Sequence, residues 1–90
     1  NKRVDPFIGK ELKIRVLFVN DSAIVVDQFP TAKIIEKTSN GNIIEFVSQD
    51  TPGLKRWLLG QAESLRVLSP QSLIDDMKIL IKKMEENYID

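Results

Sequence analysis

The stretch AKIIEKTSNGNIIEFVS, residues 32–48, decides the fold because it contains two strands joined by a tight turn. Both arms, 32–38 and 43–48, are rich in the β-branched residues that favour strands. Asn40-Gly41 between them is the strongest short hairpin signal, since both central residues of such a turn need positive φ. A two-residue loop at Asn40-Gly41 would place Glu36 opposite Glu45, which indicates that this face of the sheet is solvated there.

Two further strands lie on either side of this hairpin in the sequence. Residues 12–19 alternate between faces, and the inward face is wholly apolar: Leu12, Ile14, Val16 and Phe18. Residues 64–68 alternate in the same way, with Leu65 and Val67 inward. The chain therefore supplies four strands.

Three helices complete the pattern. Residues 23–29 follow a group of capping residues and stop at Pro30. Thr51-Pro52 combines a cap residue with proline at the first helical position, and predicts a short helix ending at Gly60. Ser69-Pro70 repeats that signature and opens a long helix that runs to Tyr88.

The predicted order is βαββαβ with an additional C-terminal helix. Its favoured closure is an α+β domain with a ferredoxin-like antiparallel sheet and two helices on one face. The other face then needs a cover, which the last helix, a second copy of the domain or a ligand could supply. We expect residues 1–11 to be a leading segment that follows a preceding domain, and residues 12–90 to form one regulatory domain.

The composition argues against catalysis and against metal or cofactor chemistry. The chain has no cysteine and no histidine, which removes thiol nucleophiles, the commonest general base and the commonest transition-metal ligand. Lys+Arg and Asp+Glu both total 13, so the formal net charge is zero. The charge balance therefore does not indicate binding to the phosphate backbone of nucleic acid. No apolar run is long enough for a membrane span, and we expect a cytoplasmic, non-enzymatic domain without a cofactor.

Two groups of residues are candidates for function. Trp57 is either a core anchor or the wall of an effector pocket, and in the second case the basic residues near it would bind the ligand: Lys55, Arg56 and Arg66. The last helix carries an apolar stripe that is either intramolecular core or a dimer interface: Leu73, Met77, Leu80, Ile81, Met84 and Tyr88.

Landmarks in the second half resemble a known family. Trp57-Leu58-Leu59, then Arg66 to Pro70, Leu73 and a long helix ending at Tyr88 are similar to the C-terminal extension, called WCX, of WYL-domain helix-turn-helix regulators. One departure follows the tryptophan-led helix. There the family usually has an aromatic–glycine step, whereas this chain has Gln61-Ala62 and carries its glycine at Gly60.

The resemblance implies a function in bacterial transcription regulation. It implies a helix-turn-helix and a WYL domain upstream, so that operator DNA would be read only by that preceding part. It also implies that this domain dimerises and helps to sense an effector, with a nucleotide-like molecule or single-stranded nucleic acid as the candidate. Two alternatives stay open: an ACT-like small-molecule module of a metabolic enzyme, or a purely structural dimerisation domain. Against the first, Asn20-Asp21-Ser22 after the opening strand contains no glycine.

Overall fold

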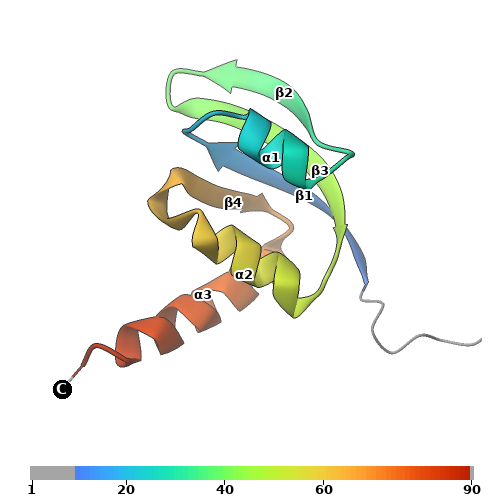
Figure 1. Ribbon diagram of the computed structural model, residues 1–90. Coiled ribbons are helices and arrows are strands. Elements are labelled where there is room, and N and C mark those ends of the chain that lie inside the picture. The colour runs from blue at the N-terminus through green and yellow to red at the C-terminus, as the bar shows by residue number, and fades with distance from the viewer. Residues whose placement is uncertain (1–9, 90) are drawn as a thin grey trace, which may run out of the picture.

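The computed structural model describes residues 10–89, and the leading segment predicted for residues 1–11 lies almost entirely outside that range. The predicted α+β class and the order βαββαβ followed by a helix are confirmed (Figure 1). The bounds are β1 Glu11–Phe18, α1 Ala23–Gln28, β2 Lys33–Thr38, β3 Gly41–Gln49, α2 Pro52–Gly60, a 3-10 turn Ala62–Ser64, β4 Leu65–Ser69 and α3 Gln71–Glu86. No helix in this range is both long and apolar enough to span a bilayer.

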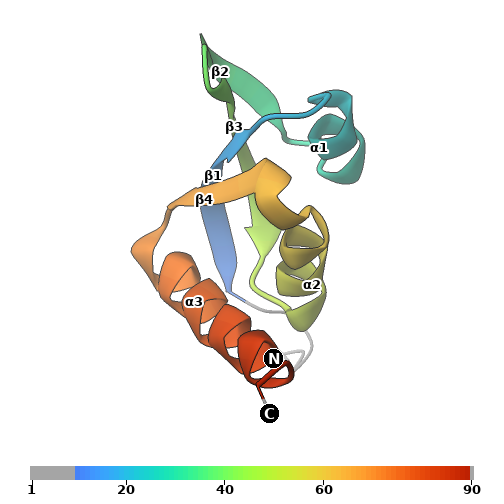
Figure 2. The same ribbon diagram turned by 90° about the vertical axis from the view of Figure 1, so that its left-hand side faces the viewer.

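The four strands form one antiparallel sheet in the order β2-β3-β1-β4. Figure 2 shows the sheet nearly edge-on, with α1 and α2 on the same side of it. The inward residues of β1 are all buried, as their alternation predicts, and the middle two, Ile14 and Val16, pair with Phe46 and Ile44 of β3. Val25 of α1 and Leu58 of α2 cover this layer with less than 2% exposure, so the main core lies between the sheet and these two helices.

The register of the β2–β3 hairpin differs from the prediction. The loop residues are Ser39 and Asn40, and Thr38 pairs with Gly41, which is the first residue of β3. Gly41 is needed because its φ is 134° and because a Cβ there would lie 2.7 Å from the backbone oxygen of Phe18. The Thr38 hydroxyl fixes the turn by donating to the Gly41 carbonyl oxygen over 2.7 Å. Glycine is therefore required at position 41 because the backbone lies close to β1, and not because this residue is at the centre of the turn.

This register also separates the two glutamates that were expected to face each other. Glu36 pairs with Ile43, and Glu45 has Lys33 on one side and Arg15 on the other. Glu45 itself is only 8% exposed, although Arg15 and Lys33 beside it on the same open face are exposed. Its Oε2 accepts a hydrogen bond from Arg15 Nε at 2.9 Å, which lowers the pKa of Glu45 below its usual value.

One of the two predicted cap-then-proline signatures is confirmed. Thr51 Oγ1 accepts a hydrogen bond from the Leu54 amide over 3.2 Å, and Pro52 opens α2. Ser69, in contrast, is the last residue of β4, and Pro70 is the residue that precedes α3. Proline has no side-chain acceptor, so α3 begins without a side-chain cap.

The last helix packs at the β4 edge of the sheet rather than over its open face. In Figure 1, α3 lies below β4 and runs away from the rest of the domain toward its C-terminal end. Leu73 and Met77, near the start of α3, belong to the same buried core as β1 and α2. The Arg15–Glu45 ion pair lies on the outward face of the sheet, which α3 does not cover.

Candidate functional site

The apolar stripe of α3 divides into a buried part and an exposed part. Leu73 is 1% exposed and Met77 is 8% exposed, so these two predicted interface residues are intramolecular core in this chain. Leu80 is half-buried. Ile81 and Met84 are both about half exposed, and Tyr88, just beyond the helix, is almost fully exposed. The intramolecular-core interpretation is therefore confirmed for the start of the stripe, and the dimer-interface interpretation of its exposed part stays a prediction.

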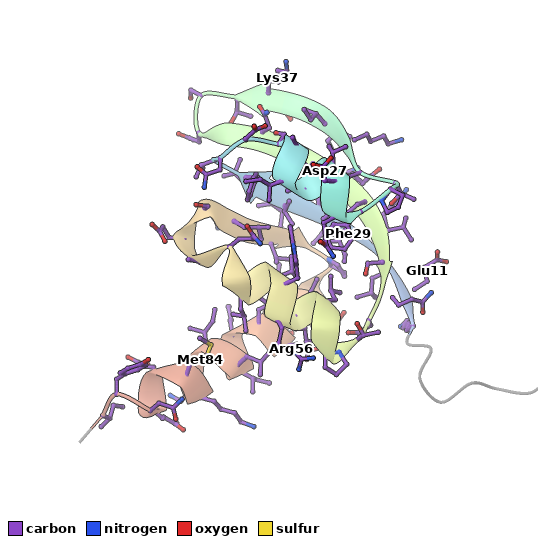
Figure 3. The ribbon with its side chains drawn as sticks, in the orientation of Figure 1. Glu11, Asp27, Phe29, Lys37, Arg56 and Met84 are labelled. Carbon is purple, nitrogen blue, oxygen red and sulfur yellow. The ribbon has the colours of Figure 1, made fainter. Side chains whose placement is uncertain are left out.

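The exposed part is larger than the sequence pattern indicated. Ile79 and Ile89 are also exposed, by 55% and 64%. We call the five exposed residues at this end the apolar tip: Ile79, Ile81, Met84, Tyr88 and Ile89. Figure 3 shows Met84 on the part of α3 that extends beyond the other elements. Sequence reasoning missed Ile79 because it lies off the stripe, although its hydrophobicity on the polar side of the helix was a usable signal.

A groove of about 740 Å³ lies between β4, α3 and the end of α2. It touches Leu65, Arg66, Val67 and Leu68, four consecutive residues of an edge strand. Consecutive strand residues point to opposite faces of a sheet, so a groove that contacts all four must run along the strand's edge. Its other walls are mostly apolar: Leu58, Leu59 and Ala62 from the α2 side, and Ile74, Met77, Ile81 and Met84 from α3.

The groove has a distinct electrostatic character. Its charged lining residues are Arg66 and Lys78, both cationic, and its other long polar side chain is Gln71. Within residues 10–89, neither Arg66 nor Lys78 is in an ion pair. A ligand with apolar groups and a negative charge would complement such a lining.

Lys55, the first predicted ligand-binding residue, is occupied by contacts within the domain. Its Nζ lies 3.1 Å from Asp50 Oδ1, an oxygen with no other partner in the described part of the chain, and 3.4 Å from Asp76 Oδ2. The Asp50 contact and, more weakly, Asp76 raise the pKa of Lys55. Since Asp50 precedes α2 and Asp76 is on α3, Lys55 links the two helices.

Trp57 lies on the other side of α2 from this link. Its ring meets Phe29 edge-on with centroids 5.0 Å apart, and Phe29 in turn stacks on Phe46 at 4.0 Å. Trp57 is half-buried, and it borders a hollow of about 370 Å³ between α1 and α2 that contains none of the three predicted basic residues. Its principal role in this structure is packing.

The four predicted ligand-binding residues are thus not brought together. Arg56 is exposed on α2 (Figure 3), Arg66 lines the groove at β4, and Lys55 and Trp57 have the separate surroundings given above. No group of three or more potential metal-ligating side chains forms within residues 10–89. Arg66 alone of the four lies in the larger groove.

These features define a small α+β domain with a groove beside its edge strand and an apolar helix end exposed to solvent. The family model of the WCX domain matches residues 10–84, which is most of the chain. The chain therefore belongs to the WCX family of regulatory domains. No curated protein matches the chain. The family match ends at Met84, inside the apolar tip.

Proposed function

We propose that this chain is a non-enzymatic regulatory domain of a bacterial transcriptional regulator, and that it self-associates through the apolar tip of α3. Membership of the WCX family supports the regulatory role. The observation that carries self-association is the exposure of large apolar residues over the second half of α3 and just beyond its end. Exposed apolar surface of this kind is typical of protein–protein contacts.

The exposed part of the stripe suits a symmetric, antiparallel pair of tips that cross at Met84, which lies between Ile81 and Tyr88. A two-fold interface of this type repeats each favourable contact twice, which is how most homodimers are built.

A buried large apolar side chain contributes about 1.5–3 kcal/mol, so two tips provide enough apolar surface to offset the entropy lost on association. A domain of this size also gains from dimerisation because its own core is small. Glutamate at position 84 would introduce a charge into the centre of the pair. Association would then require burying an unpaired carboxylate.

Sedimentation velocity of the chain over a range of concentrations tests this. We expect a monomer–dimer equilibrium for the wild type, and for Met84→Glu a dimer dissociation constant raised by about 100-fold, equivalent to about 2.7 kcal/mol. The matched control is Ile24→Glu, since Ile24 is 44% exposed on α1 at the opposite end of the molecule. A wild-type chain that stays monomeric, or equal losses in both variants, would refute self-association through the tip.

For effector sensing, the candidates remain a nucleotide-like molecule or single-stranded nucleic acid. Lys55, Trp57 and Arg66 lie in separate surroundings and do not form one effector pocket, which favours self-association as the main role of this domain. Operator DNA would be bound by a preceding helix-turn-helix domain. In the complete regulator, Met84→Glu should then weaken operator binding through loss of the dimer, as an electrophoretic mobility shift would show.

We also propose that the fold is of the ferredoxin-like type. Support comes from the strand order β2-β3-β1-β4. In this order, the two strands of each βαβ unit are separated by one strand of the other unit: β3 lies between β1 and β2, and β1 lies between β3 and β4. In that arrangement, α3 is an addition to the basic fold.

A further inference from the structure

The two edges of the sheet differ in how far they are protected against pairing with another strand. β2, at one edge, carries Lys33 and Lys37 and has a bulge between Ile34 and Glu36. Lys37 projects from the β2 edge in Figure 3. Lysines and bulges on an edge strand discourage the addition of a further strand. β4, at the opposite edge, has the sequence LRVLS, with Arg66 as its one charged residue.

The backbone of β4 has unpaired groups on the side of the groove. The Val19 amide donates to the Ser64 carbonyl over 3.0 Å, which makes this a hydrogen-bonded pair of the β1–β4 ladder. Hydrogen-bonded and non-bonded pairs alternate in an antiparallel ladder, so Arg66 also faces β1 while Leu65 and Val67 direct their N–H and C=O groups outward. Within residues 10–89, no backbone or side-chain partner outside the sheet contacts these groups.

The groove supplies the other requirements of an added strand. Apolar side chains from α2 and α3 border the β4 edge, so alternate side chains of an incoming segment would be buried. Arg66 and Lys78, without ion pairs in the described part of the chain, favour an acidic residue in that segment.

We propose that the β4 edge and the groove beside it bind an extended peptide segment as a fifth strand, and that this segment combines apolar side chains with at least one Asp or Glu. The segment would come from a partner protein. This binding site shares Ile81 and Met84 with the tip, but it is distinguished from the proposed self-association by its use of the β4 backbone.

The test uses the ¹⁵N-labelled chain with the substitutions Ile79→Glu and Ile89→Glu. Both residues belong to the tip but not to the groove lining, so the double variant weakens self-association and leaves the site intact. The probe is a capped peptide of alternating valine and glutamate, about eight residues long, the usual length of an added strand. We expect saturable shifts at Leu65 and Val67, with amide exchange at both slowed about tenfold as new hydrogen bonds form. Exchange at Arg66, already paired with β1, should not change.

Two control peptides separate strand addition from simple apolar binding. N-methylation of the two central amides removes a donor from each edge of the peptide and should weaken binding about tenfold, as should replacement of glutamate by lysine. Arg66→Glu should reduce the preference for the glutamate peptide over the lysine peptide. The proposal is overturned if no saturable shift occurs, if the shifts are confined to α3, or if the N-methylated peptide binds as tightly. None of these results would alter the sedimentation test of the tip.

Discussion

Exchanging the residue types at positions 60 and 62 should stabilise this domain. Ala62 has a φ of 56°, in the left-handed region where an L-residue is strained by about 1–2 kcal/mol. Gly60 is the last residue of α2, it has no positive φ, and a Cβ added to it would meet no atom within 4 Å. Glycine is thus absent from the position whose backbone needs it and present at one that does not.

The magnitude follows from the two sites separately. Ala62→Gly relieves the strain but adds about 0.4–1 kcal/mol of unfolded-chain entropy, which leaves a net gain of about 0.5–1 kcal/mol. Gly60→Ala should add about 0.5–1 kcal/mol because glycine is unfavourable in a helix. The double variant should gain about 1–2 kcal/mol, and its melting midpoint should rise by about 5–10 °C.

Urea unfolding followed by far-ultraviolet circular dichroism measures these changes, at one fixed protein concentration for all variants. Ala23→Gly is the matched control, since Ala23 is an exposed residue with helical backbone in α1. It should lose about 0.5–1 kcal/mol, the opposite sign to Ala62→Gly. If Ala62→Gly lowers the stability as much as the control does, the argument from backbone strain is wrong.

Three further measurements test the packing and the charges. Leu73→Ala should lower the free energy of unfolding in urea by about 2–5 kcal/mol. Ile79→Ala, on the exposed side of α3, should lower it by less than about 1 kcal/mol at a protein concentration where the chain is monomeric. Similar losses in the two variants would contradict the division of α3 into a buried and an exposed part. Gly41→Val should destabilise by at least about 1–3 kcal/mol because of its positive φ and the close backbone oxygen of β1, and an unchanged midpoint would refute this. The lowered pKa of Glu45 contributes stability that is present above the unfolded value of about 4.3 and is lost as the pH falls through the folded value. The stability difference between the wild type and Glu45→Gln should therefore shrink on acidification, and Arg15→Gln should remove most of that pH dependence.

Local patterns predicted much of this fold, because alternation and capping depend on neighbouring residues. The inward face of β1 and the Thr51 cap of α2 are examples. The hairpin register could not be predicted from the Asn-Gly signal, because the need for glycine at position 41 comes from its contact with Phe18, a residue distant in the sequence. The burial of Glu45 likewise depends on Arg15, which becomes its neighbour only when β1 and β3 pair.

The candidate site was less predictable than the fold. Helical periodicity shows which face of α3 is apolar, but it does not show how far along the helix the rest of the domain extends, so buried Leu73 and exposed Met84 look alike in the sequence. The groove was missed because it depends on β4 being an edge strand, which is a property of the strand order. The basic residues were grouped by closeness in the sequence, although Lys55 and Trp57 face different neighbours on α2.

The contact between Trp57 and Phe29 gives the domain an optical probe at a single position. Trp57 is the chain's one tryptophan, so its fluorescence and near-ultraviolet circular dichroism come from one environment, the packing of α2 against α1 and β3. That environment is remote from the tip of α3 (Figure 1). Dilution that separates two copies should leave the emission maximum unchanged, whereas loss of the core should shift it to longer wavelength. Dissociation and unfolding can therefore be observed separately without attaching a dye.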